Sequence, residues 1–148
     1  MSDKSIYFDM DGTIADLYGV VDWLPKLRAS DPSPYADARP LVNLSRLARL
    51  LNRLTACGVS VNIISWTSRG GSPEYNEAVR AAKLAWLARH LPSVKWDNVF
   101  IVAYGTPKNT LGRGVLFDDE KLNRDAWGAG AHDETKIFEI LKEMVTEM

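Results

Sequence analysis

The stretch Ser5-Ile6-Tyr7-Phe8-Asp9-Met10-Asp11-Gly12-Thr13 organises the interpretation of the whole chain. Its apolar run, residues 6–8, is typical of a short buried strand. The run ends directly in two carboxylates, Asp9 and Asp11, which a Gly-Thr turn follows. Such a strand places these residues at the carboxyl edge of a sheet, where open α/β sheets bind ligands. Because two carboxylates this close repel each other, they require a cation, or they divide the roles of nucleophile and acid.

Composition limits the classes of function. The 148 residues suffice for one domain with its own core, and contents of 46% hydrophobic and 25% charged residues are ordinary for a soluble globular protein. A net charge of -1 and a pI of about 6.1 argue against an extended nucleic-acid ligand, but not against a single nucleotide. No signal region or membrane span is expected, because no apolar run is long enough. The single cysteine, Cys57, fits a reducing compartment, so we expect a cytoplasmic protein.

Further stretches with strand character alternate with helical patterns. Strands are expected at residues 59–65, 98–103 and 114–117, with a weaker candidate at 129–132. The spacing of apolar residues predicts a helix with Pro40 in its first turn and Gly58 as its C-terminal cap, and further helices over 72–90, 121–127 and 133–148. This alternation implies crossover connections and a mostly parallel sheet. The expected fold class is therefore α/β, with helices on both faces of the sheet.

The helix predicted over 72–90 has a tryptophan outside its apolar stripe. Ala81, Leu84, Ala85 and Ala88 form the stripe, whereas Trp86 lies nearly on the opposite side. We expect Trp86 to pack under a neighbouring loop, and a partner-binding surface is the alternative.

Polar side chains recur where the predicted strands end. They follow the strands directly or lie in the loops just beyond them, at Asp9, Asp11, Ser65, Lys108, Asp118 and Asp119. Parallel strands bring their carboxyl ends to one edge of the sheet, so these side chains are expected to converge. Unrelated surface residues have no reason to recur at that single edge. The convergence is the strongest indication of a functional site in the sequence.

The residues Asp9-Met10-Asp11-Gly12-Thr13 resemble the first motif, DxDGT, of the phosphatases in the haloacid dehalogenase (HAD) superfamily. The other three motifs of that superfamily are matched in order by Ser65, Lys108 and the pair Asp118-Asp119, so the resemblance covers nearly the whole chain. Residues 76–127 are more specifically similar to the 5'(3')-deoxyribonucleotidase-like group of bacteria and phages. The sequence departs from that group in its short cap region and in the loop 65–71.

The resemblance implies a three-layer Rossmann-like (HAD-like) fold built from a single domain over residues 1–148. In this superfamily, a cap that roofs the site is inserted after the first strand. Here residues 16–40 would form a small cap or flap, with a helix from about Asp16 to Arg28 and a proline-containing loop after it. A surface helix and loop without this role is the alternative that the sequence leaves open.

The same resemblance implies a Mg²⁺-dependent phosphomonoester hydrolase that forms an aspartyl-phosphate. Asp9 would be the nucleophile and Asp11 the general acid and base, while Lys108 would hold the phosphate and keep Asp9 ionised. Phosphate binding is assigned to Ser65, with Thr67 as the alternative, and to Lys108, Gly12 and Thr13. The Mg²⁺ ion is assigned to Asp9, the backbone carbonyl of Asp11, Asp118 and Asp119.

The expected substrate is a small-molecule phosphate ester, in particular a nucleoside monophosphate, which would make the chain a 5'-nucleotidase or deoxyribonucleotidase. Two alternatives are open: a phosphatase for a larger phosphorylated ligand, such as a nucleic-acid end or a protein, and a non-catalytic HAD-fold binding protein. The intact Asp11 argues against a pure binder, and the near-neutral charge argues against nucleic acid. No membrane partner is expected, and the oligomeric state is left open, a homo-oligomer included.

Overall fold

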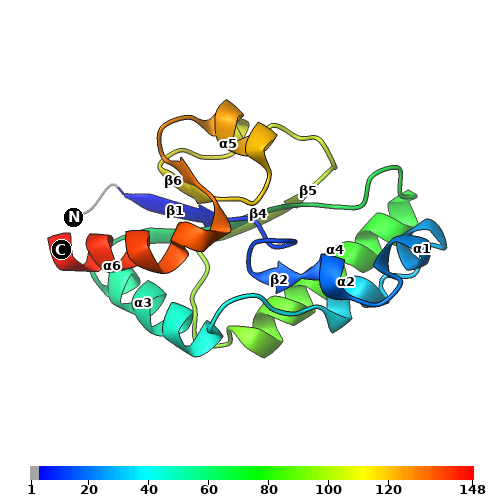
Figure 1. Cartoon of the computed structure of the whole chain (residues 1–148), viewed down its shortest axis with the longest axis horizontal. Helices are drawn as coiled ribbons and strands as arrows, with labels where there is room; N and C mark the ends of the chain where they lie inside the picture. Colours follow the sequence, from blue (N-terminus) through cyan, green and yellow to red (C-terminus); the bar gives the residue numbers. More distant parts are fainter. Residues whose placement is uncertain (1–3) are drawn as a thin grey trace.

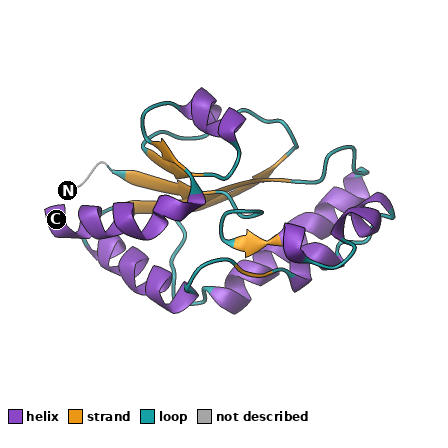
Figure 2. Cartoon of the chain, viewed as in Figure 1, coloured by secondary structure: helices purple, strands orange, loops and turns teal. Residues whose placement is uncertain are grey.

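Five parallel strands form the centre of the molecule, whose computed structural model describes residues 4–148. The strands are β1 (Ser5–Phe8), β4 (Ser60–Trp66), β5 (Asn98–Val102), β6 (Val115–Phe117) and β7 (Ala131–His132). Their order is β5-β4-β1-β6-β7, and Figures 1 and 2 show the sheet between layers of helices. β1 is central, because Ile6 pairs with Val61 on one side and with Val115 on the other. The mostly parallel α/β sheet expected from the sequence is confirmed.

Helices cover both faces of the sheet, as the three-layer fold requires. One face carries α3 (Leu44–Ala56), α4 (Pro73–His90) and α6 (Ile137–Glu147), and the other carries α5 (Lys121–Trp127) (Figure 1). The side chain of Asn43 caps the start of α3 by accepting a hydrogen bond from the Arg46 amide at 3.0 Å. Buried leucines at i, i+4 and i+7 then fix this helix against the sheet, namely Leu47, Leu51 and Leu54.

The buried face of α4 differs from the alanine stripe expected in the sequence. The residues that it buries are Tyr75, Val79, Lys83, Trp86 and Leu87, and Leu84 of the expected stripe is exposed. Large apolar side chains determine this rotation of the helix, because they remove more apolar surface from water than alanines do. The Trp86 indole nitrogen donates a hydrogen bond to the Ala38 carbonyl oxygen at 2.8 Å, which confirms the packing under a neighbouring loop.

The segment between β1 and α3 folds differently from the predicted helix over residues 16–28. It contains β2 (Ala15–Asp16), the 3-10 helix η1 (Leu17–Gly19), α1 (Trp23–Arg28), α2 (Ser33–Asp37) and β3 (Arg39–Pro40). The helix prediction was wrong at its start because Ala15 and Asp16 pair antiparallel with Pro40 and Arg39. The two strands thereby close the segment at its base, and α2 packs against α4. We call residues 15–40 the flap segment.

The order of the strands creates a switch point between β1 and β6. From β1 the chain passes through α3 and α4 to β4 and β5, and then returns to build β6 and β7 on the other side. Ligands of open α/β sheets bind where the strand order reverses in this way. Asp9 and Asp118 are the residues that directly follow β1 and β6, so both lie at the switch point. Within residues 4–148, no helix is both long and apolar enough to cross a membrane.

Candidate active site

Asp9 and Asp118 share one buried lysine. The Nζ atom of Lys108 lies 2.7 Å from Asp118 Oδ2 and 3.1 Å from Asp9 Oδ1. Lys108 opens the 3-10 helix η2 (Lys108–Thr110) and is 4% exposed. Burial disfavours its charge, but the neighbouring Asp9 and Asp118 outweigh burial, so the pKa of Lys108 is raised. Three residues predicted from separate motifs therefore lie within direct contact of each other.

The Gly12-Thr13 turn places Asp119 beside this group. Gly12 has a φ of +80°, and a Cβ atom there would collide with the Asp119 carboxylate. The buried Thr13 hydroxyl donates a hydrogen bond to Asp119 Oδ1 at 3.1 Å and lies 3.5 Å from Asp9 Oδ2. These two residues thus fix the positions of carboxylates in the structure, and their predicted contact with a phosphate stays a prediction.

Asp9, Asp118 and Asp119 form an oxygen cluster of the kind that holds a metal ion. Each offers a carboxylate oxygen, and these atoms lie within 4.8 Å of one another. Burial, together with the charge of Asp9, raises the pKa of Asp118 to about 6 and that of Asp119 to about 8. A cation between the three groups would remove this mutual repulsion. Hard oxygen donors in this number suit Mg²⁺.

Asp11, also predicted as a site residue, turns its carboxylate toward a lysine that the sequence analysis missed. Lys83 Nζ lies 2.7 Å from Asp11 Oδ2, and the Lys83 side chain is 1% exposed. Burial raises the pKa of Asp11, and the positive charge of Lys83 offsets part of that rise. Lys83 could have been found from its i+4 spacing, because it continues the buried line of Tyr75 and Val79 along α4.

The two candidate hydroxyl groups near the end of β4 differ in their surroundings. Ser65 is fully buried, and its Oγ accepts a hydrogen bond from Lys83 Nζ at 2.6 Å. Thr67, directly after β4, lines the same pocket as Asp9 and Asp11. Its amide donates to the Val102 carbonyl oxygen at 2.8 Å, while its hydroxyl has no hydrogen-bond partner within residues 4–148.

Asp9, Asp11 and Lys108 line a cavity of about 450 Å³, a size suited to a small ligand. Aromatic side chains from the flap segment, β4 and the loop after β5 line it, namely Tyr18, Trp23, Tyr35, Trp66 and Tyr104. Trp66 and Tyr104 pack with their ring centroids 4.9 Å apart, and Tyr18 and Trp23 with theirs 5.0 Å apart. The cavity is therefore lined by charged groups at the ends of the strands and by aromatic side chains around them.

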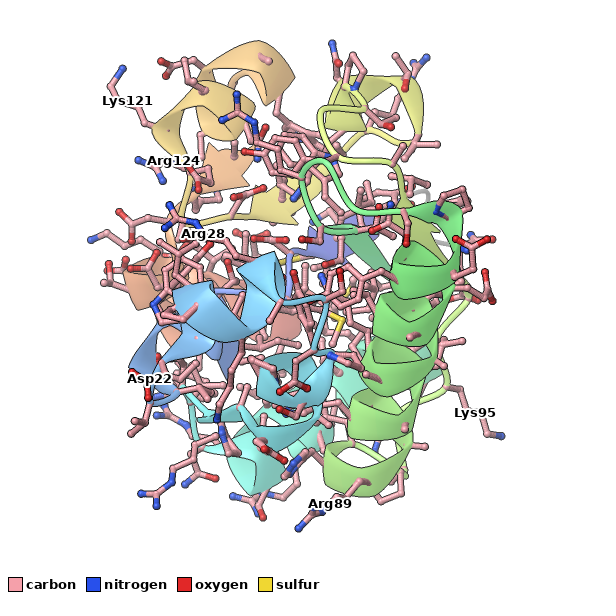
Figure 3. All side chains as sticks on the ribbon, turned by 90° about the vertical axis from the view of Figure 1, so that its right-hand side faces the viewer. Asp22, Arg28, Arg89, Lys95, Lys121 and Arg124 are labelled. Carbon is pink, nitrogen blue, oxygen red and sulfur yellow. The ribbon has the colours of Figure 1, made fainter. Side chains whose placement is uncertain are left out.

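Two arginines, Arg28 and Arg69, also line this cavity. Both are exposed, and neither has an ion-pair partner in the part of the chain that the structure describes. Figure 3 shows Arg28 extending from α1 on the side of the molecule where Arg124 of α5 also lies. Positive charge is thus available around the cavity as well as at the ends of the strands.

Solved structures with this fold include two D,D-heptose 1,7-bisphosphate phosphatases. The one from B. bronchiseptica, complexed with magnesium and phosphate, has a TM-score of 0.60 and 14% identity, over 98% of this chain and 99% of its own. The one from Burkholderia thailandensis has a TM-score of 0.60 and 13% identity, over 97% and 99%. The Pnkp1/Rnl/Hen1 complex has a TM-score of 0.55 and 17% identity, over 88% of this chain and 44% of the other. No protein-family model and no curated protein sequence matches the chain.

At these identities the likeness establishes the fold, which is the HAD-like α/β fold of the structures it matches. The three-layer fold that the family resemblance implies is therefore confirmed. Because one fold can carry many activities, the chemistry of this site depends on its own residues.

Proposed function

We propose that this chain is a Mg²⁺-dependent phosphomonoester hydrolase of the HAD type that forms an aspartyl-phosphate on Asp9. One observation carries the proposal: a single cavity contains the Asp9 carboxylate, Lys108 at 3.1 Å from it, and the carboxylate of Asp11. A nucleophile, a cation for the phosphoryl oxygens and a proton donor are the groups that phosphoryl transfer needs. The magnesium and phosphate bound to a phosphatase of the same fold support it further.

The acidic cluster fits Mg²⁺. Asp9, Asp118 and Asp119 would hold the ion, together with the backbone carbonyl of Asp11 that the family resemblance implies. Burial and the nearby charge of Asp9 raise the pKa values of Asp118 and Asp119, and a divalent cation would balance the negative charge of the cluster. When bound, the ion neutralises part of the charge of the phosphate dianion that would otherwise repel Asp9.

The side chains would then carry out two displacements. In the first, a carboxylate oxygen of Asp9 bonds to phosphorus as the bond to the leaving oxygen breaks, and Asp11 gives a proton to that oxygen. In the second, a water oxygen bonds to phosphorus, Asp11 takes a proton from that water, and the bond from phosphorus to Asp9 breaks. Inorganic phosphate leaves, and both carboxyl groups regain their first state. Lys108 stabilises the charge that develops on the equatorial oxygens.

We assign the phosphate-binding hydroxyl to Thr67 rather than to Ser65. The assignment is supported by the position of Thr67 in the cavity wall and by its hydroxyl, which is free to donate. The Ser65 hydroxyl, by contrast, is buried and bonded to Lys83. Ser68 lines the cavity beside Thr67 and offers a second hydroxyl at this wall.

The cavity walls favour a nucleoside monophosphate as substrate. A nucleobase presents a flat face, and aromatic rings such as Trp23 and Tyr18 bind such faces by stacking. Arg28 and Arg69 add guanidinium groups that stack on bases and attract anions. The flap segment supplies Tyr18, Trp23, Arg28 and Tyr35, so it would select the base. The near-neutral charge of the chain suits a single nucleotide better than a polynucleotide.

Phosphate release from a panel of phosphomonoesters tests this function. The panel contains 5'- and 3'-(deoxy)nucleoside monophosphates, sugar phosphates and D,D-heptose 1,7-bisphosphate, each with Mg²⁺ and with EDTA. We expect Mg²⁺-dependent release, fastest from nucleotides, and none from Asp9→Asn, whose amide keeps the shape of the carboxylate but is a poor nucleophile. An exposed acid, Asp125, supplies the control variant Asp125→Asn. An Asp9→Asn protein with full activity would overturn the mechanism, and release from sugar phosphates alone would overturn the nucleotide assignment.

A further inference from the structure

Lys83 is the most deeply buried cation that the structure describes, and it faces the site from α4. All three N–H bonds of its ammonium group have acceptors: Asp11 Oδ2 at 2.7 Å, Ser65 Oγ at 2.6 Å and the Trp66 carbonyl oxygen at 2.7 Å. The ring of Tyr35 lies 5.1 Å from Nζ as a fourth neighbour. Asp11 follows β1, Ser65 and Trp66 end β4, and Tyr35 belongs to α2. Lys83 therefore joins the segment after β1 to the neighbouring strand.

Stability alone gives no reason for a lysine at this position. Removing an ammonium group and a carboxylate from water costs free energy that their attraction often fails to exceed. An apolar residue here would continue the buried line of Val79 and Leu87 on α4 and would serve packing better. Arg80, on the same helix, shows the common alternative, because its ion pair with Glu77 lies at the surface.

We propose that Lys83 is the positioning residue of Asp11, the residue that fixes the direction in which the Asp11 carboxylate points. The inference rests on the proposed function, in which Asp11 gives a proton to the leaving oxygen. Without the ammonium group, the Asp11 carboxylate would lose the hydrogen bond to its Oδ2 atom and the nearer of its two positive neighbours, while the negative charge of Asp9 would remain. The hydrogen bonds from Lys83 to Ser65 and Trp66 fix the ammonium group, and with it the Asp11 carboxylate, relative to the end of β4. The cavity residues Thr67 and Ser68 follow this strand directly.

The quality of the leaving group separates this role from a merely structural one. An alkoxide needs a proton as it leaves phosphorus, whereas 4-nitrophenolate leaves readily without one. We expect Lys83→Met to lower kcat/KM for a nucleoside monophosphate by about 10²-fold, the scale of lost general acid catalysis. The same variant should lower kcat/KM for 4-nitrophenyl phosphate by less than about 10-fold. The parameter kcat/KM is chosen because it reports the steps up to departure of the leaving group.

A double-mutant cycle gives the second readout. If Lys83 acts through Asp11, Lys83→Met should cause almost no further loss in an Asp11→Asn background. Lys95→Met serves as the matched control, because Lys95 is exposed and points away from the molecule in Figure 3. Circular dichroism and calorimetric Mg²⁺ binding establish that each variant is folded and keeps its metal site. Lys83→Gln, which keeps a hydrogen-bond donor, replaces Lys83→Met if the methionine variant does not fold.

The possible results are distinct. A loss confined to the poor leaving group and absent from the Asp11→Asn background supports the proposal. The proposal is overturned if Lys83→Met lowers kcat/KM equally for both substrates, or if it causes its full loss also in the Asp11→Asn background. In either case the activity of the wild-type protein would still support the proposed function. A wild-type protein without phosphomonoesterase activity overturns the proposed function, and the positioning role with it.

Discussion

Thr67 and Ser65 lie two residues apart at the end of β4 and differ in what their hydroxyl groups can reach. The Ser65 hydroxyl is bonded to Lys83, so its effect on the reaction would pass through the Lys83–Asp11 pair. Thr67 lines the cavity, and we propose that its hydroxyl donates directly to a phosphoryl oxygen. Within a strand, residues two apart point to the same face of the sheet. Thr67 lies after the last residue of β4, so this rule does not require its side chain to share the direction of Ser65.

At this scale we predict that Thr67→Val lowers kcat by about 10²-fold, the usual effect of removing one preorganised donor. Valine keeps the branched shape, so the fold should be retained. The measurement is steady-state hydrolysis of a nucleoside monophosphate and of 4-nitrophenyl phosphate. Thr67→Val should slow both substrates alike, because both carry the same phosphoryl oxygens. Thr146→Val, at an exposed threonine of α6, is the control, and a Thr67→Val enzyme with wild-type kcat would refute the assignment.

The elements show where sequence reasoning succeeds and where it fails. β1 and β6 were predictable, because short apolar runs that stop on acids have few alternative structures. The secondary structure inside the flap segment was not, because the start of the predicted helix is replaced by pairing between Ala15 and Pro40, which lie far apart along the chain. Lys83 was missed because a lysine in a helix is exposed by default, and its i+4 spacing from Tyr75 and Val79 was the signal in the sequence that it is buried.

The flap segment contributes Trp23 to the cavity wall. Trp23 of α1 lines the cavity, so Trp23→Leu should raise KM for nucleoside monophosphates by about 10-fold, within the range of one lost stacking contact. KM for glycerol phosphate, which has no ring to stack, should stay within about two-fold. Leucine keeps apolar packing against Leu17 and Tyr35. Leu122→Ala, at an 82% exposed residue of α5, is the control. Equal KM changes for both substrates would show that Trp23 supports the flap segment and does not bind the base.

For the whole molecule, the carboxylates of Asp9, Asp118 and Asp119 that would bind a metal ion also lower the stability of the metal-free protein as the pH rises. In the folded protein the pKa of Asp118 is about 6 and that of Asp119 about 8, both above the ordinary 3.8. The folded state therefore binds these protons more tightly than the unfolded chain does. The contribution of the two groups to the free energy of unfolding is greatest below pH 3.8 and falls as the pH rises toward 8. At pH 7 the Asp119 carboxyl, with its pKa of about 8, still keeps its proton in the fold, and a cation that binds between the carboxylates would displace that proton.

Because the contribution of Asp119 to the free energy of unfolding falls as the pH rises, we predict that removing its charge stabilises the metal-free protein. In EDTA, Asp119→Asn should raise the melting temperature relative to wild type, and more so at pH 8.5 than at pH 5, where the wild-type carboxyl is largely protonated in the fold. Each kcal/mol of relief corresponds to about 2–4 °C in a chain of this size. Added Mg²⁺ should reverse the order, because the wild type gains more from binding a cation than a variant that lacks one ligand. Differential scanning calorimetry at both pH values, with Asp125→Asn as control, measures this. A difference between the two proteins that is the same at both pH values and unaffected by Mg²⁺ would mean that Asp119 neither titrates in this range nor holds the ion.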